Sequence, residues 1–227
     1  MNVAAVIPAR GGSRGIPRKN LVDFCGKPLV AWSIIQARDT PLINSVHVSS
    51  DSDEILAVSA RYGAQTIKRP NEISGDTATT ESALLHAWQT MPTKPDLLVL
   101  LQPTSPLRKP DDLQKALAQF QEQGWDSAFS GAVLLDFLIW EKDSRGTLRS
   151  FNYDYKNRGR RQDRQPQYVE NGSFYLCKPD ILQSGNRLGG RIGICLMDFW
   201  QSFEIDTSQD LEMSRLIFES KLRRVYA

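Results

Sequence analysis

The sequence predicts an α/β protein built on a mostly parallel, open β-sheet flanked by helices. Residues 3–7 and 97–101 are short apolar runs without polar alternation, which is typical of parallel strands covered on both faces. Between such runs lie amphipathic segments long enough to be crossover helices. A loop rich in glycine and arginine follows the first run, at the carboxyl end of a strand, where open α/β sheets bind their ligands.

The N-terminal half alternates strands and helices in the order that a parallel sheet requires. Pro8 closes the first strand, and Gly63 ends the second helix in the left-handed position that favours glycine. Pro110 opens the fourth helix. The expected elements are strands at 3–7, 45–50, 65–68 and 97–101, and helices at 29–38, 53–62, 80–91 and 110–121.

The C-terminal half breaks this alternation. A fifth strand is expected at 125–134, and strand character returns at 173–177 and 192–197. Thr207 is expected to cap a last helix, with Asp210 completing a capping box. Between these elements, residues 136–167 mix aromatic side chains with a basic stretch and show no helical period. We therefore expect that segment to leave the sheet.

The segment that leaves the sheet is rich in aromatic side chains, which can be buried only against another surface. They are Phe137, Trp140, Phe151, Tyr153 and Tyr155. A symmetry-related copy is the commonest such surface, so a homodimer is predicted. The expected division is an α/β domain at 1–135 and 171–227, with an inserted dimerisation arm at 136–170.

The composition argues against several classes of protein. The chain has 28 Lys and Arg against 26 Asp and Glu, and a net charge of +2 gives no global attraction to nucleic acid or to an anionic membrane. No apolar run approaches the roughly 20 residues that span a bilayer, and residues 1–8 lead into a strand, so a cytoplasmic protein is expected. Cys25, Cys177 and Cys195 are widely spaced, which favours buried thiols over disulfides or a zinc site.

The strongest local signal is the loop at residues 8–20. Gly11, Gly12 and Gly15 let backbone N–H groups approach an anion closely, and Ser13 adds a hydroxyl donor. The loop's cations are Arg10, Arg14, Arg18 and Lys19. Cations so close together repel one another unless an anion lies among them, which favours an anion site, able to neutralise a triphosphate, over a solvated basic loop. The loop matches neither the Walker A nor the G-x-G-x-x-G pattern.

Five segments in the same order along the chain resemble the CMP-sialic acid synthetases, the acylneuraminate cytidylyltransferases. They are the loop at 8–20, residues 68–70 with 74–80, residues 101–108, residues 160–163 with Asn171-Gly172, and residues 204–207. The resemblance spans nearly the whole chain. It implies a Rossmann-like α/β nucleotidyltransferase fold with an inserted dimerisation arm, CTP as co-substrate and Mg²⁺ as the metal.

The same resemblance implies a CTP site near the loop, with phosphate contacts from the loop itself and cytosine contacts from residues 69 and 78–80. The expected CTP-binding residues are Arg10, Gly11, Ser13, Arg14, Lys19, Asn20, Arg69, Ala78 and Thr80. The family usually has a lysine where Arg14 stands, so the charge is kept but the shape of the contact changes. Taken alone, the threonine-rich run before the third helix favours a helix N-cap.

Glu204 and Asp206 alternate across Ile205, so an extended segment places both carboxylates on one face, where two like charges need a cation. Taken alone, the segment fits a helix cap at Asp206 equally well. The resemblance implies Mg²⁺ held by Asp206 and Glu204. The family more often has aspartate at both positions, so contact of Glu204 through water stays open.

For the acidic sugar, the resemblance implies contacts from the loop after the fourth strand and from the arm of a neighbouring subunit. The implied residues are Gln102, Arg160, Arg161 and Gln162. Taken alone, Gln102 favours a turn residue, and the basic stretch fits a solvated turn. Some relatives carry an arginine just before the Asn-Gly pair, where this chain has Val169-Glu170.

The implied reaction is attack of the anomeric hydroxyl of a nine-carbon acidic sugar, an N-acylneuraminate, on the α-phosphorus of CTP, with release of pyrophosphate. Lys19, Arg10 and Asp206 are the expected catalytic residues, acting through charge rather than as covalent nucleophiles. The same reaction on legionaminic or pseudaminic acid is the alternative. The alternative from another class is a non-catalytic nucleotide-binding regulatory protein, which the carboxylate pair disfavours.

Overall fold

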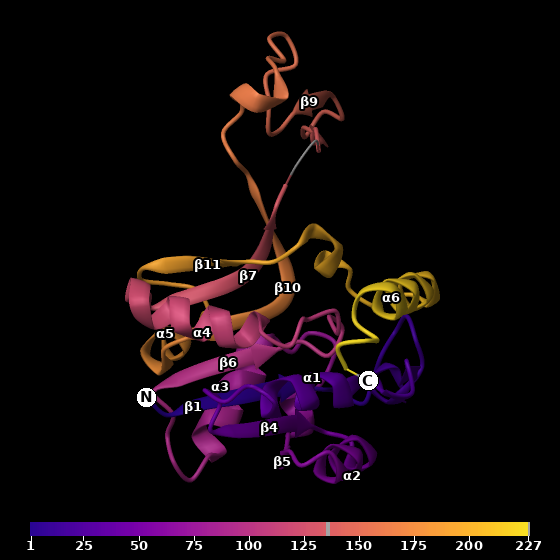
Figure 1. The fold of residues 1–227 in the computed structure, drawn as a ribbon, viewed down its shortest axis with the longest axis vertical. Coiled ribbons are helices and arrows are strands. Elements are labelled where there is room, and N and C mark those ends of the chain that lie inside the picture. Colours follow the sequence, from indigo (N-terminus) through magenta and orange to yellow (C-terminus); the bar gives the residue numbers. More distant parts are fainter. Residues whose placement is uncertain (135–136, 227) are drawn as a thin grey trace.

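The structure is a computed structural model that describes residues 1–134 and 137–226, apart from the side chain of Arg161. Its body contains a 7-stranded sheet in the order β11-β7-β10-β6-β1-β4-β5 (Figure 1). The strand β1 (Val3–Pro8) lies between β6 (Leu97–Leu101) and β4 (Ser45–Ser50), and β4 also pairs with β5 (Gln65–Lys68). All of these pairings are parallel, as predicted.

The sheet is apolar throughout its centre because helices cover both faces. Odd-numbered side chains of β1 pack in one core with α1 (Leu29–Arg38), α2 (Asp53–Arg61) and α4 (Asp112–Gln123). Its even-numbered side chains pack in a second core with α3 (Thr80–Thr90) and α5 (Pro179–Gln183). The expected doubly covered parallel sheet is therefore observed.

The other end of the sheet departs from a purely parallel arrangement. β10 (Tyr168–Cys177) runs antiparallel to both β6 and β7 (Ser127–Val133), and β11 (Ile192–Leu196) pairs parallel to β7. Residues 168–170, which were expected in the arm, pair with β7 in the sheet. The sheet is thus mixed, because the chain re-enters it in the reverse direction after residues 137–167.

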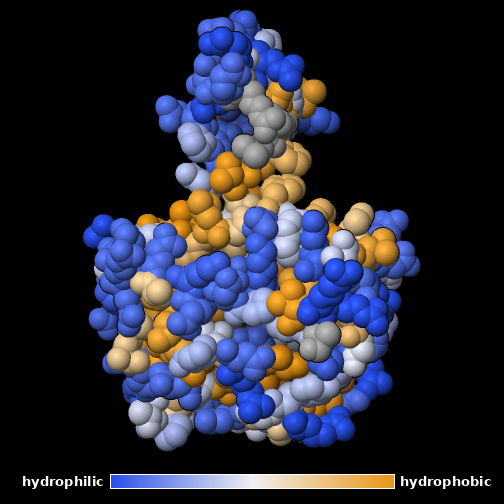
Figure 2. Space-filling model, in the orientation of Figure 1, coloured by the Kyte–Doolittle hydropathy of each residue, from blue (hydrophilic) through white to orange (hydrophobic). Residues whose placement is uncertain are grey.

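Residues 137–167 project from the body of the molecule, as Figure 1 shows. They contain the small hairpin β8 (Trp140–Lys142) and β9 (Leu148–Ser150) and a 3-10 turn, η3 (Arg161–Asp163). Figure 2 shows apolar surface gathered where this projection leaves the body, and the ring of Phe137 stacks there on Phe199 with centroids 5.3 Å apart. The predicted boundary between 135 and 136 lies outside the described residues. The role of the arm in dimerisation stays a prediction.

The last helix, α6 (Ser208–Lys221), begins as the sequence predicts. Thr207 Oγ1 accepts a hydrogen bond from the N–H of Asp210 at 3.2 Å, and the Asp210 carboxylate accepts one from the N–H of Thr207 at 2.7 Å. The predicted capping box is therefore confirmed. None of the helices described here is long and apolar enough to cross a membrane.

Several short elements were not predicted, and one helix begins later than expected. α4 starts at Asp112 rather than Pro110, because residues 110 and 111 lie in the preceding turn. The additional short elements are η1 (Lys19–Leu21), the hairpin β2 (Asp23–Phe24) and β3 (Lys27–Pro28), η2 (Asn71–Ile73), α5 and η4 (Phe199–Ser202). They are too short to carry a periodic apolar pattern.

Candidate active site

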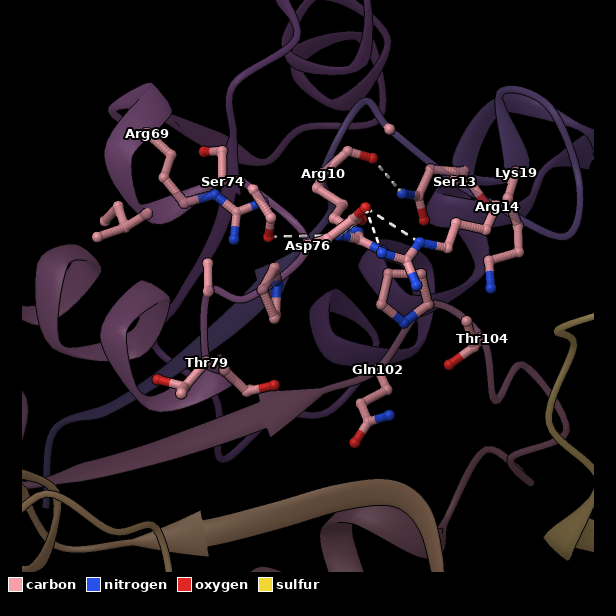
Figure 3. Close-up of a pocket in the computed structure, with 18 of the residues that line it drawn as sticks. Arg10, Ser13, Arg14, Lys19, Arg69, Ser74, Asp76, Thr79, Gln102 and Thr104 are labelled. Atoms are coloured by element: carbon pink, nitrogen blue, oxygen red, sulfur yellow. Dashed lines mark hydrogen bonds and ion pairs between the residues drawn. The ribbon is translucent and has the colours of Figure 1, made fainter.

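A cavity of about 490 Å³ opens at the carboxyl ends of β1 and β6. Figure 3 shows Arg69 and Thr79 on one side of it and Lys19 and Thr104 on the other. The cavity is lined by three chain segments together with Arg69 and Asp206; the segments are the loop after β1, residues between 73 and 80 up to the start of α3, and residues 102–104 after β6. The structure thus brings together segments that lie far apart in the sequence.

Among the predicted site residues, those that line this cavity are Arg10, Ser13, Arg14, Lys19, Asn20, Arg69, Ala78, Thr80, Gln102 and Asp206. Gly11 and Glu204 do not line it. The Gly11 N–H is donated to Asp51 Oδ1 at 2.9 Å, so in this structure it is engaged by the protein rather than directed to a ligand.

The loop after β1 is fixed by contacts that its small residues permit. Asn20, which is 8% exposed, donates from Nδ2 to the carbonyl of Arg10 at 2.9 Å. At Gly15, a Cβ atom would lie 1.9 Å from the carbonyl oxygen of Asp206, so only glycine allows this loop to contact the 204–207 segment. Arg18 adopts a left-handed conformation with φ of 54° and pairs with Glu54. The loop is therefore an ordered part of the cavity wall.

The loop cations that line the cavity each contact a carboxylate. Arg10 and Arg14 both bind Asp76, at 2.8 Å and 2.5 Å, and Lys19 Nζ donates to Asp206 Oδ1 at 2.8 Å. Hydrogen bonds from Arg14 and then Arg10 hold the pKa of Asp76 below its ordinary value. In this structure the loop cations that line the cavity are therefore paired with carboxylates of the protein, and sequence reasoning missed Asp76.

Arg69 lies at the opposite side of the cavity from Lys19 and is almost fully buried, with 6% exposure. Its backbone N–H donates to Ser50 O at 2.8 Å, while its Nε and Nη2 atoms make no hydrogen bond within the described part of the chain. Burial lowers the pKa of this guanidinium. Both of these atoms are themselves buried, so they are not open to the cavity in this structure, although the residue lines it.

The threonine-rich run before α3 acts as a helix cap. Thr79 is the N-cap, and its hydroxyl oxygen accepts from the N–H of Ser82 at 3.1 Å. The capping role that the run suggested on its own is therefore confirmed. Ala78 and Thr80 flank the cap and line the cavity.

Glu204 and Asp206 flank Ile205 on a segment held against the loop after β6, where the Ile205 N–H donates to Thr104 O at 2.8 Å. Glu204 lies over Gly172, where a Cβ atom would be 1.9 Å from Glu204 Oε1. Burial, and next the charge of Asp206, raise the pKa of Glu204 against opposing effects of nearby cations. The raised pKa of Glu204 thus comes first from its burial and only next from the neighbouring carboxylate.

The carboxylate pair does not form a complete protein ligand set. Within residues 1–134 and 137–226, no group of three or more His, Cys, Asp or Glu side chains is arranged to hold a metal ion. A cation bound by Glu204 and Asp206 would need further oxygen ligands from a substrate or from water. Mg²⁺ sites commonly use one or two carboxylates together with substrate phosphates, so the residues present fit that ion.

Arg108 supports the loop after β6, although the sequence analysis gave it no role. Its side chain is fully buried, and Nη1 donates to Ser33 Oγ at 3.1 Å and to Gln36 Oε1 at 2.8 Å. Its Nη2 donates to the carbonyls of Gln102 and Ser173. Burial lowers its pKa to about 10. This arginine fixes the backbone that presents Gln102 to the cavity.

The predicted sugar-binding residues of the arm lie elsewhere. Arg160 and Gln162 line a second cavity, of about 620 Å³, on the projecting arm. Arg160 there pairs with Asp163 at 2.8 Å. Arg161 lies in η3, and its side chain is outside the described residues. Within one chain, the structure does not bring Arg160 or Gln162 together with Gln102.

Comparisons with known proteins agree with this geometry. Residues 4–215 match the family described as cytidylyltransferase. The chain is 34% identical over 212 residues to N-acylneuraminate cytidylyltransferase A of Danio rerio, covering 92% of this chain and 49% of that protein. It is 29% identical over 230 residues to pseudaminic acid cytidylyltransferase of Campylobacter jejuni subsp. jejuni serotype O:23/36, covering 96% of this chain and 97% of that protein. The chain thus spans about half the length of the first relative.

The fold comparison gives the same architecture. A CMP:2-keto-3-deoxy-manno-octonic acid synthetase solved in complex with CTP superposes with a TM-score of 0.74 at 19% identity, covering 98% of this chain and 100% of that one. A 4-diphosphocytidyl-2C-methyl-D-erythritol synthase from Anaerococcus prevotii has a TM-score of 0.70 at 9% identity, covering 96% and 98%. The predicted α/β nucleotidyltransferase fold is therefore confirmed.

Proposed function

Because the chain belongs to the cytidylyltransferase family, we propose that it transfers CMP from CTP to the anomeric hydroxyl of a sialic acid and releases pyrophosphate. The observation that carries this proposal is the cavity itself. Arg10, Arg14 and Lys19 face it from one loop, with Asp206 directly beside Lys19. An array of cations next to a carboxylate is suited to a metal-bound triphosphate.

Phosphate binding falls to the loop after β1. The guanidinium groups of Arg10 and Arg14 bind a carboxylate in this structure, and phosphate oxygens accept the same paired N–H groups. Ser13 is available as a further hydroxyl donor on the cavity wall. This side of the cavity is therefore the proposed place of the CTP triphosphate.

The nucleoside is proposed to lie on the opposite side, toward Arg69. Arg69 lines the cavity there, and a guanidinium can donate to the carbonyl oxygen of a pyrimidine. Ala78 and Thr80 contribute to the same wall from the start of α3, and Asn20 holds the backbone of Arg10 between the two ends. Arg69, Ala78 and Thr80 are therefore proposed to recognise the base.

Glu204 and Asp206 are proposed to hold Mg²⁺ together with CTP phosphate oxygens. The ion would supply charge neutralisation during pyrophosphate departure. Asp206 contacts Lys19 at 2.8 Å, so the ammonium lies next to the proposed metal site. Glu204 is half-buried, and contact through a water molecule suits its position over Gly172.

In the proposed reaction, the anomeric hydroxyl of the sugar gives its proton to solvent, and its oxygen forms a bond to the α-phosphorus of CTP. The bond between the α-phosphorus and the oxygen bridging to the β-phosphorus breaks, and that oxygen leaves with pyrophosphate. Lys19 and Arg10 stabilise the charge that develops on the leaving group, which is the main source of catalysis in such transfers. Gln102, presented by the backbone that Arg108 fixes, is proposed to position the sugar.

Arg160, Arg161 and Gln162 are proposed to contact the acidic sugar in the cavity of a second copy. Within its own chain Arg160 is in a different cavity from Gln102, so it contributes only if the arm reaches a neighbouring subunit. The exposed aromatic side chains of the arm, such as Phe151 at 65% exposure, support a homodimer that buries them. A cytoplasmic location is proposed as well.

Pseudaminic acid is the second candidate acceptor. The Campylobacter jejuni pseudaminic acid cytidylyltransferase matches this chain along 97% of its length, whereas the Danio rerio enzyme matches along 49%. Legionaminic acid remains the further alternative from the sequence.

The test is pyrophosphate release from CTP and Mg²⁺ with N-acetylneuraminate, pseudaminate and legionaminate in separate reactions. Rapid release with N-acetylneuraminate, abolished by a chelator, is the expected result. Rapid release with another of the acids alone would reassign the acceptor. CTP binding without release for any acid would overturn the enzymatic proposal and favour a nucleotide-binding regulatory protein.

A further inference from the structure

The phosphate side of the cavity already contains an anion that belongs to the protein. Asp76 Oδ1 accepts a hydrogen bond from Arg10 Nη1 at 2.8 Å. Asp76 Oδ2 accepts hydrogen bonds from Arg14 Nε at 3.0 Å and Nη2 at 2.5 Å (Figure 3). Arg10 Nη1 also donates to the Gly75 carbonyl at 3.3 Å. These contacts of Asp76 with Arg10 and Arg14 are called the Asp76 bridge below.

The Asp76 bridge uses the two guanidinium groups that are proposed to hold CTP phosphates. Carboxylate and phosphate oxygens are alternative acceptors for the same guanidinium donors. A triphosphate placed beside an intact bridge would also meet the negative charge of Asp76, and like charges in contact repel even when water screens them partly. Binding of CTP at this loop therefore competes with the bridge.

The bridge is placed where it can open without disturbing the core. The side chain of Asp76 is 49% exposed, and that of Arg14 is 78% exposed. A Cβ atom at neighbouring Gly75 would meet nothing within 4 Å, so there is open space on that side of the backbone. Opening the bridge thus costs the ion pairs and little packing.

We propose that Asp76 is a built-in competitor of phosphate, which holds Arg10 and Arg14 before CTP binds and is displaced by the CTP phosphates. This inference rests on the proposed CTP site. Asp76 belongs to the same segment as Ala78 and Thr80, which are proposed to face the base. Because Asp76, Ala78 and Thr80 all line the same cavity, displacement of Asp76 changes the contacts of the segment that also carries these base-facing residues.

The competition lowers the affinity of the protein for any ligand that needs both arginines. Exposed ion pairs are individually weak, so removing the competitor is expected to tighten phosphate binding by about 3- to 10-fold. The gain shrinks at high salt, because the pairs that compete are screened. If Asp76 had a purely structural role, replacing it would not raise the affinity for these ligands.

The experiment measures dissociation constants by calorimetry for CTP and for inorganic pyrophosphate, without Mg²⁺ and without sugar, at low and high salt. The variants are Asp76→Asn, which keeps the shape of the side chain, and Asp76→Ala, which removes it. Asp111→Asn is the matched control, because Asp111 is 51% exposed, pairs with Lys115 and does not line the cavity. It makes the same change of net charge.

Tighter binding of both ligands by the two Asp76 variants at low salt, with the control unchanged, is the expected result. If the wild-type protein binds CTP and the Asp76 variants bind it equally or more weakly, the competitor role is wrong while the CTP site stands. An equal gain in the Asp111 variant would show a net-charge effect and would also overturn the role. Failure of the wild-type protein to bind CTP would overturn the proposed function and this inference together.

Discussion

Lys19 links the two charged parts of the cavity, because its ammonium contacts Asp206 from the phosphate loop and its side chain is only 14% exposed. Replacing it by alanine removes a positioned charge from the leaving group. We expect Lys19→Ala to lower turnover at saturating CTP by roughly 100-fold, the size of effect found for one preorganised contact. The measurement is the steady-state rate of pyrophosphate release.

The control for this variant is Lys115→Ala. Lys115 lies on α4, pairs with Asp111 and does not line the cavity. Its removal is expected to leave turnover close to that of the wild-type protein. A Lys19→Ala variant with nearly unchanged turnover would remove Lys19 from the mechanism.

Glu204 supplies a prediction about pH. Burial and the charge of Asp206 raise its pKa in the folded state, so the ionised side chain destabilises the fold above that pKa. Glu204→Gln is therefore expected to raise the melting temperature at neutral pH, without metal, by about 1–4 °C. This gain in melting temperature is expected to shrink as the pH falls through the folded-state pKa of Glu204. It disappears below the ordinary glutamate pKa, where the side chain is protonated in both the folded and the unfolded state.

Thermal unfolding between neutral pH and pH about 4 checks this behaviour. Added Mg²⁺ is expected to stabilise the wild-type protein in the presence of CTP and to stabilise the glutamine variant less. A variant that is less stable than the wild-type protein at neutral pH would show that Glu204 acts as a favourable structural contact instead.

At the scale of elements, the loop after β1 depends on close approach to the 204–207 segment. A Cβ atom at Gly15 would lie 1.9 Å from the Asp206 carbonyl, whereas one at Gly12 would meet nothing within 4 Å. Gly15→Ala is expected to cost about 1–3 kcal/mol of unfolding free energy, as overpacking does. Gly12→Ala is the matched control and should unfold like the wild-type protein in denaturant titrations.

The two glycine variants also test whether the position of the loop matters for activity. Since Gly15→Ala moves the loop away from Asp206, its activity should fall together with its stability. Equal stability of the two variants would show that the approach of the loop to Asp206 is not needed for the fold.

The regular elements of the N-terminal half could be predicted closely because their signals are local. β1, β4, β5 and β6 follow from short apolar or β-branched runs, and α6 follows from its capping box. The direction of β10 could not be predicted, since the apolar pattern of residues 173–177 is the same for a parallel and an antiparallel strand. It depends on the path of the chain through the arm.

Sequence could predict only those site residues whose type and spacing by themselves suggest a chemical role. The cations of the loop after β1 and the alternating carboxylates at 204 and 206 carry such signals. Asp76 and Arg108 do not, because their roles come from partners far along the chain: Asp76 meets Arg10, and Arg108 meets Ser33 and Gln36. The sequence signal that pointed to Arg108 was its position, as a charged residue shortly after the apolar strand at 97–101 and two prolines.

At the scale of the whole molecule, the arm and the cavity are separate parts of one chain. If the arm completes the site of a neighbouring copy, Lys19→Ala and Arg160→Ala damage different halves of each shared site. A mixture of the two inactive variants then forms heterodimers with one intact site. We expect such a mixture to recover about a quarter of wild-type activity when subunits exchange freely.

The control for complementation mixes Lys19→Ala with a chain carrying both substitutions, which leaves no intact site. Sedimentation should give a particle of twice the 25.6 kDa chain mass in every case. Full activity of Arg160→Ala alone would show that Arg160 is not needed for sugar binding. An active monomer would show that the site is not shared between two copies.

The central claim is that this cavity transfers CMP from CTP to an acidic sugar. The most direct measurement follows CTP labelled at its α-phosphorus in the presence of Mg²⁺ and N-acetylneuraminate, pseudaminate or legionaminate. The account predicts that the label appears in a CMP-sugar and not in pyrophosphate, and that Lys19→Ala suppresses its appearance. Label that remains in CTP with every acid, or that appears as free CMP alone, would contradict the account.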